Sequence, residues 1–159
     1  MIGVATAPRT AGPGAPVASG PAGRALELDL PAVAESCPHA RHAVRAALGE
    51  TAVELSAVDL AVTEAVANVV VHAYRDRDSS AEPGRVRLTL DLDAGGVWVV
   101  VADDGLGMAP RTDTPGLGLG LSLIANLCDE LEIDQRVDGT TVQMRFLVAS
   151  NEGPLEKGT

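Results

Sequence analysis

The segment from residue 85 to residue 104 constrains the fold more than any other part of the chain. Residues 85–93, RVRLTLDLD, alternate apolar and polar side chains, and residues 97–104, VWVVVADD, form a second, more apolar run. The residues AGG between them suit a tight turn, so the two runs predict a β-hairpin with a buried face. A sheet built on this hairpin needs a second layer to cover that face.

Other segments supply the covering layer and the remaining strands. Residues 24–30 alternate as a strand does, and residues 130–137 and 140–148 pair as a hairpin around DGT. Apolar residues recur at helical spacing in three segments, namely 35–48, 56–74 and 121–128. The order strand, helix, helix, strand, strand, helix, strand, strand predicts an α/β (α+β) two-layer sandwich. In it, helices cover one face of a mixed, mostly antiparallel sheet.

The second helical segment leaves two interpretations open. Residues 56–59, SAVD, have the spacing of a capping box and precede residues 60–74, LAVTEAVANVVVHAY. Val62 and Val66 fall on one helix face, but six of these fifteen residues are β-branched, which disfavours an isolated helix. A helix is expected if that face is buried, and a strand is the alternative.

Residues 105–120 are expected to be loop.

Residues 24–148 are expected to form one domain between two tails. Residues 1–23 are rich in proline and glycine, which predicts disorder, and residues 149–159 are a second flexible end. We find no secretory signal and no apolar run of the length that spans a membrane, so a soluble, cytoplasmic protein is expected. Two cysteines, Cys37 and Cys128, fit a reducing compartment.

The charge composition excludes several classes of function. A net charge of −10 argues against direct binding to nucleic acid or to an anionic membrane, and it favours protein partners with basic patches. The three aromatic residues are too few to stack nucleic-acid bases. The single lysine, Lys157, lies near the end of the sequence, which excludes phosphate-binding loops and kinase mechanisms that require a lysine.

A small cluster of cysteine and histidine raises the question of a zinc site. Cys37, His39 and His42 offer three ligands at loose spacing, without an obvious fourth. An ordinary helix surface is therefore the favoured interpretation.

Glu64, Asn68 and His72 form a polar stripe on the predicted helix, because residues four apart lie on one face. Such a stripe is often a solvated surface. Asparagine is unfavourable in the middle of a helix, however, and its amide oxygen is a suitable ligand for Mg²⁺. Glu64, one turn away from Asn68, is positioned to act as a base.

Two glycine-containing segments follow. Asp103 ends the apolar strand and begins the pattern DxGxG with Gly105 and Gly107. Alone this pattern is a strand-terminating turn, whereas in a site Asp103 would accept a hydrogen bond from a ligand amine. Residues 116–124, GLGLGLSLI, lack the dinucleotide-binding pattern GxGxxG. They suit either a phosphate-binding helix N-terminus or a strand weakened by glycine.

Taken in order, these motifs resemble the GHKL ATPase superfamily, which includes gyrase B, the histidine kinases and MutL. The shared features are an E-x-x-x-N helix, DxGxG after an apolar strand, a glycine-rich helix start and GTT opening a strand. Residues 60–74 and the segment GLGLGLSLIANLCDELEI look most like the RsbW-like bacterial anti-sigma factor serine/threonine kinases. The resemblance covers about residues 24–148 and implies the Bergerat ATPase fold.

The resemblance also implies ATP and Mg²⁺ as cofactors and a role for each motif residue. Glu64 would be the general base, Asn68 would coordinate Mg²⁺ on the triphosphate, and Asp103 would bind the adenine amino group. The other residues would line the nucleotide: Gly105 and Gly107 at the purine, Gly116, Gly118 and Gly120 at the phosphates, and Thr140 near the adenine through water.

The implied reaction is transfer of the γ-phosphoryl group of ATP to a STAS-domain anti-anti-sigma factor. The same protein would sequester a sigma factor and form a homodimer. Residues 108–115, MAPRTDTP, form a shorter lid than in better-known family kinases and carry one cation, Arg111. The alternative is therefore a catalytically weak ATP-binding module that regulates its partner by binding alone. The ATPase half of a histidine kinase is disfavoured, because no helix with a phospho-acceptor histidine precedes the domain.

Overall fold

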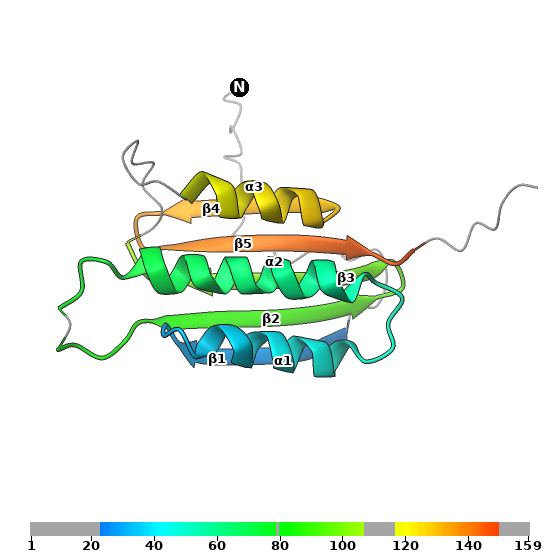
Figure 1. Ribbon diagram of the computed structural model, residues 1–159, viewed down its shortest axis with the longest axis horizontal. Helices are drawn as coiled ribbons and strands as arrows, with labels where there is room; N and C mark the ends of the chain where they lie inside the picture. The colour runs from blue at the N-terminus through cyan, green and yellow to red at the C-terminus, as the bar shows by residue number, and fades with distance from the viewer. Residues whose placement is uncertain (1–22, 79, 107–116, 150–159) are drawn as a thin grey trace, which may run out of the picture.

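The computed structural model describes residues 23–78, 80–106 and 117–149 and shows two layers (Figure 1). One layer is a five-stranded sheet, and the other consists of helices that lie on one face of that sheet. In chain order the elements are β1 (Gly23–Pro31), α1 (Ser36–Leu48), α2 (Leu55–Asn68), the π-helical turn η1 (Val69–Ala73), β2 (Arg85–Asp93), β3 (Gly96–Asp103), α3 (Leu117–Leu127), β4 (Glu130–Arg136) and β5 (Gly139–Leu147).

The strand order is β1-β2-β3-β5-β4, and every neighbouring pair is antiparallel. The expected two-layer α+β sandwich is confirmed, but its described strands form an antiparallel sheet and not a mixed one. The connections explain the difference. Helices α1 and α2 carry the chain out and back between β1 and β2, so these neighbours run in opposite directions. Strands β3 and β4, on either side of α3, do run in the same direction, but β5 lies between them.

The core lies between the sheet and the helices. Alternate residues of a strand point to opposite faces, so one face of each strand can be wholly apolar. In β3 and its neighbour β5 the apolar residues on this face are all buried, and they are Val97, Val99, Val101, Val142, Met144 and Phe146. Val58, Val62 and Val66 of α2 are buried in the same cluster.

The helix interpretation of residues 60–74 is confirmed, and the strand alternative is wrong. Val62 and Val66 are 0% exposed, and this burial offsets the low helix propensity of β-branched residues. Contrary to expectation, the segment Leu55–Ala73 is long and apolar enough, by length and composition alone, to cross a membrane. In this fold its apolar side packs against the sheet as a core helix.

Two helix starts differ from expectation. Helix α2 begins at Leu55, and no described side chain caps its first turn, so the capping box predicted at residues 56–59 does not form. Helix α3 begins at Leu117, inside the segment 105–120 that was expected to be loop. The leucines of this segment favour a helix, which offsets the poor helix propensity of its glycines. Gly120 also allows α3 to lie close to α2.

Candidate functional site

Glu64 and Asn68 of α2 lie beside the first turns of α3. A Cβ atom placed on Gly120 would lie 3.3 Å from Asn68 Oδ1, 3.4 Å from Asn68 Nδ2 and 3.4 Å from Glu64 Oε2. Both side chains are half-buried. The structure therefore brings three of the predicted site residues together, and it does so at a position where any larger residue would press on the two polar side chains.

The Nδ2 atom of the Asn68 amide is not satisfied by the described residues around it. Its Nδ2 atom is buried and has no hydrogen-bond partner among the described residues, and the same holds for His72 Nδ1 one turn later. A buried polar atom without a partner costs about 1–3 kcal/mol, so such atoms call for a ligand, an ion or water. Burial is the main cause that lowers the pKa of His72, and the positive charge of the nearby Arg75 lowers it further. The imidazole is therefore neutral at neutral pH.

Asp103 ends β3, and its side chain lies on the face of the sheet that the helices cover. Its Oδ1 accepts a hydrogen bond from the Gly105 N–H at 2.9 Å, and its register partner in β5 is Thr140. Burial raises the pKa of Asp103, although the backbone N–H groups of Gly105 and Thr140 lower it. The arrangement leaves a fixed, partly desolvated acceptor for a ligand amine.

Glycines let the segment after Asp103 approach its neighbours. The Leu106 N–H donates to the Ala73 carbonyl at 3.0 Å, and a Cβ atom on Gly105 would lie 2.2 Å from that carbonyl oxygen. Gly139 has a φ of +149°, and a Cβ atom there would lie 2.2 Å from the Asp103 carbonyl oxygen. Sequence reasoning selected Gly105 but missed Gly139, although the sequence DG at the turn of the hairpin was an available signal.

A pocket of about 300 Å³ opens at this end of the sheet. The residues that line it follow α2, β3 and β4, and they are Ala73, Tyr74, Asp76, Arg77, Asp104, Gly105, Leu106, Val137 and Asp138. Gly105 belongs to both the pocket lining and the predicted site. The pocket thus adjoins the predicted site without including Glu64, Asn68 or Asp103.

The described site residues form two groups at one end of the molecule. Glu64, Asn68 and Gly120 meet between α2 and α3, and Asp103 and Thr140 meet where β3 ends and β5 begins. Figure 1 shows the end of α2, the start of α3 and these two strand ends on the same side of the molecule. Of the other predicted site residues, Gly118 lies in the first turn of α3, whereas Gly107, Gly116 and the segment 108–115 lie outside the described residues.

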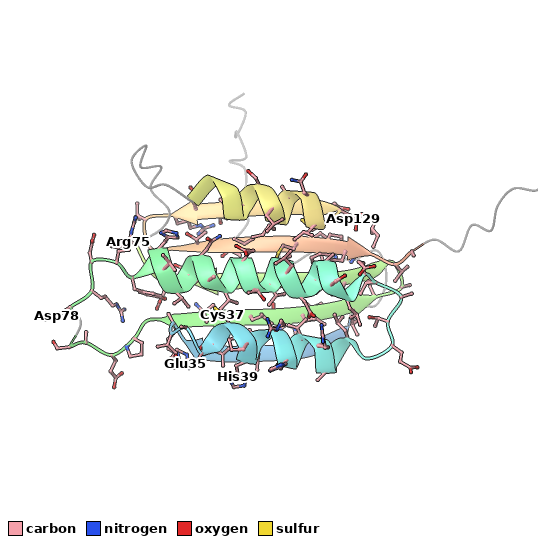
Figure 2. All side chains as sticks on the ribbon, viewed as in Figure 1. Glu35, Cys37, His39, Arg75, Asp78 and Asp129 are labelled. Carbon is pink, nitrogen blue, oxygen red and sulfur yellow. The ribbon has the colours of Figure 1, made fainter. Side chains whose placement is uncertain are left out.

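The cysteine and histidine cluster gains no support as a metal site. No group of three or more His, Cys, Asp or Glu residues in the described part of the chain could hold a metal ion. His39 points outward from α1 (Figure 2), whereas Cys37 is half-buried. Burial raises the pKa of the Cys37 thiol, so it is protonated at neutral pH.

Comparison with known proteins identifies the family. The profile of the histidine kinase-like ATPase domain matches residues 30–146. The chain therefore belongs to the histidine kinase-like ATPase domain family, in agreement with the GHKL resemblance of its motifs. ATP is the ligand that membership of this family implies for the site.

Two similar curated proteins belong to one narrower class, the anti-sigma factors. The anti-sigma F factor of Clostridium novyi (strain NT) is 28% identical over 145 residues, which cover 82% of this chain and 99% of that protein. The anti-sigma F factor of Bacillus subtilis (strain 168) is 28% identical over 134 residues, which cover 75% of this chain and 89% of that protein. The chain is thus similar to anti-sigma F factors over most of their length.

Solved structures support the fold. The RsbU and RsbW domains of a Mycobacterium tuberculosis protein match with a TM-score of 0.57 and 22% identity, covering 77% of this chain. The histidine kinase domain of a blue-light-activated kinase from Erythrobacter litoralis matches with a TM-score of 0.51 and 24% identity, covering 75% of this chain. The chain spans 33% of the first of these structures and 62% of the second. At these identities the likeness shows the fold alone.

Proposed function

We propose that this protein is an ATP-dependent anti-sigma factor serine/threonine kinase. It binds Mg-ATP, phosphorylates a STAS-domain anti-anti-sigma factor and sequesters a sigma factor. The observation that carries the proposal is the meeting of Glu64 and Asn68 at Gly120, where the Nδ2 atom of Asn68 is buried without a hydrogen-bond partner among the described residues. The similarity to anti-sigma F factors supports the class of partner.

The phosphate side of the site would be formed by α2 and the start of α3. The Asn68 amide oxygen would ligate Mg²⁺, which prefers hard oxygen donors and usually binds together with substrate phosphates. The backbone N–H groups around Gly116, Gly118 and Gly120 would receive the phosphate oxygens, because the first N–H groups of a helix have no partner within it. When bound, Mg²⁺ would neutralise part of the phosphate charge. In other phosphate sites a lysine takes this role.

The base side would be formed by the strand ends. Asp103 would accept a hydrogen bond from the adenine amino group, which is a donor where guanine has a carbonyl oxygen. Gly105 and Gly107 would leave room for the purine beside the backbone. Thr140 would contact the adenine through water.

The transfer step needs one proton acceptor. Glu64 would take the proton of the attacking serine or threonine hydroxyl as its oxygen bonds to the γ-phosphorus. The bond between that phosphorus and the β–γ bridging oxygen would break at the same stage, and ADP would leave. Positioning and charge neutralisation would supply most of the rate acceleration.

A second candidate is an ATP-binding module that regulates its partner with little catalysis. The observation that favours it is the length of the segment 108–115, which carries a single cation, Arg111. A short lid encloses the γ-phosphate less completely, and enclosure excludes water from the reaction. Binding of ATP is common to both candidates, so phosphoryl transfer separates them.

The proposal also concerns location and assembly. A regulator of sigma factors acts in the cytoplasm, and we extend to this chain the homodimer that its family resemblance implies. Its functional contacts are then with proteins, and no direct contact with nucleic acid or a membrane surface is required.

The decisive experiment incubates the purified protein with Mg-ATP and its co-purified STAS-domain partner, followed by mass spectrometry of the partner. We expect a phosphorylated serine or threonine with the wild type and none with Glu64→Ala, while ATP affinity in Glu64→Ala stays within about threefold of wild type. Glu50→Ala, which removes an exposed carboxylate after α1, is the matched control and should phosphorylate normally. ATP binding by the wild type without phosphorylation would favour the second candidate.

A further inference from the structure

Tyr74, the residue after η1, has a hydroxyl that connects three parts of the chain. Its oxygen lies 2.6 Å from the Arg85 carbonyl oxygen and 2.6 Å from Asp104 Oδ1. It also accepts hydrogen bonds from the backbone N–H of Arg85 at 3.1 Å and of Asp104 at 3.3 Å. One hydroxyl therefore connects the end of η1, the start of β2 and the segment that follows β3.

The ring of Tyr74 is held independently of the hydroxyl. Gly84 is buried against it, and a Cβ atom there would lie 2.2 Å from the ring carbon Cζ. On the ring, the Arg77 guanidinium lies 4.9 Å from the centroid. Burial and the hydrogen bond to Asp104 raise the pKa of the Tyr74 phenol to about 12, so the hydroxyl keeps its proton and can donate at any ordinary pH.

The segment fixed by this hydroxyl is the one that shapes the Asp103 carboxylate. Asp104 follows Asp103 directly, and the next N–H, that of Gly105, donates to Asp103 Oδ1 at 2.9 Å. The Leu106 N–H then bonds to the Ala73 carbonyl. Any movement of Asp104 away from Tyr74 would shift the Gly105 N–H and with it the direction in which the Asp103 carboxylate points.

We propose that Tyr74 is a positioning residue for base recognition, which acts by holding Asp104 so that Asp103 and Gly105 keep the geometry that selects adenine. This inference rests on the proposed ATP-binding function. Tyr74 itself is not assigned a contact with the nucleotide. Its effect should therefore be on the discrimination between purine bases and not on the binding of phosphate.

The test measures dissociation constants for ATP and GTP, by displacement of a fluorescent ATP analogue, in wild type and in Tyr74→Phe. The Phe ring can keep its packing on Gly84 while the hydroxyl is lost. We expect ATP affinity to fall on the order of tenfold and the preference for ATP over GTP to shrink by a similar factor, because Asp103 then rejects the guanine carbonyl less strictly. Asp104→Ala removes the other partner and should give the same change, with no further loss in the double variant.

Thr63→Ala is the matched control. It removes a hydroxyl of α2 that donates a hydrogen bond to the Asp59 carbonyl at 2.8 Å, and it leaves the segment 104–106 unchanged. Melting temperatures are recorded for every variant. A purely structural role for Tyr74 would weaken ATP and GTP binding equally, and an unchanged preference in Tyr74→Phe would overturn the inference. A wild type that binds no ATP would overturn the proposed function and this inference with it.

Discussion

Asp103 experiences two opposing effects on one carboxyl group. Burial raises its pKa, and the backbone N–H groups of Gly105 and Thr140 lower it without cancelling that rise. A carboxyl group whose pKa is higher in the folded than in the unfolded protein makes the folded state less stable at pH values above that pKa. The ligand-free protein therefore holds a charged group at a cost in stability, and a hydrogen bond from a bound amine would offset this cost.

The variant Asp103→Asn should separate stability from binding. The amide oxygen can still accept the Gly105 hydrogen bond, so at pH 8 the ligand-free variant should melt at a higher temperature than wild type. The difference should shrink as the pH falls into the acidic range where Asp103 of the wild type takes up a proton. ATP affinity should fall by roughly tenfold or more, because a hydrogen bond to a charged acceptor is lost.

The two measurements are thermal melting between about pH 4 and about pH 8 and calorimetric titration with ATP. The control is Glu50→Gln, which replaces an exposed carboxylate. It should leave the melting temperature and the ATP affinity unchanged. An unaltered ATP affinity in Asp103→Asn would remove Asp103 from the base site. A lower melting temperature at pH 8 would show that the charged form is favoured by the fold.

The sequence allows some of these residues to be selected and not others. Glu64 and Asn68 are four residues apart, so helical spacing alone places them together. The role of Tyr74 depends on Arg85 and Asp104, which lie 11 and 30 residues further along the chain. No local pattern reports such contacts, because they exist only once β2 and β3 have taken their places beside the end of α2.

Among the elements, the contact between α2 and α3 depends on the absence of a side chain at residue 120. Gly120→Ala should raise the helix propensity of α3, by about 1 kcal/mol for a helix interior. The new Cβ atom would also press on the Asn68 amide and on Glu64 Oε2, from which it would lie 3.3–3.4 Å. We therefore expect an unchanged or higher melting temperature together with weaker Mg-ATP binding, by roughly fivefold to tenfold.

The comparison variant for this prediction is Ala125→Gly, at an exposed position of the same helix. It should lower stability by about 1 kcal/mol and leave Mg-ATP affinity unchanged. Melting curves and calorimetric titrations of the two variants should thus change in opposite ways. Full affinity in Gly120→Ala would show that α2 and α3 do not enclose the phosphates between them.

Periodicity predicts the elements well where the pattern is unbroken. The alternation in residues 85–93 and 97–103 corresponds closely to β2 and β3. Periodicity does not predict the backbone at the site, where Leu117–Gly120 is helical despite its glycines and Val69–Ala73 forms the π-helical turn η1. Both features depend on contacts between elements: α3 packs on α2 at Gly120, and the carbonyl of Ala73 accepts from the Leu106 N–H. The antiparallel sheet likewise depends on the strand order, which periodicity does not contain.

Over the whole molecule, charges are paired across the face of the sheet that bears no described helix. Arg145 binds Asp93 at 2.7 Å, and Arg24 binds Asp91 at 2.6 Å. These arginines are committed to the fold, and the chain as a whole carries a net charge of −10. A nucleoside triphosphate therefore approaches a protein whose net charge has its own sign, which favours binding through backbone N–H groups and an accompanying cation.

This charge balance makes stabilisation by ATP dependent on Mg²⁺. A ligand that binds only the folded protein stabilises it by about 2.7 kcal/mol when present at 100 times its dissociation constant, which raises the melting temperature of a domain of this size by roughly 10 °C. We expect a shift of this order with Mg-ATP, and the loss of most of it when EDTA removes the metal. Asn68→Ala should lose the Mg²⁺-dependent part, whereas Asn126→Ala, on the exposed surface of α3, should keep it. An equal shift with and without EDTA in the wild type would contradict the assignment of Asn68 as the metal ligand, because the nucleotide would then be held by the backbone and the base site alone.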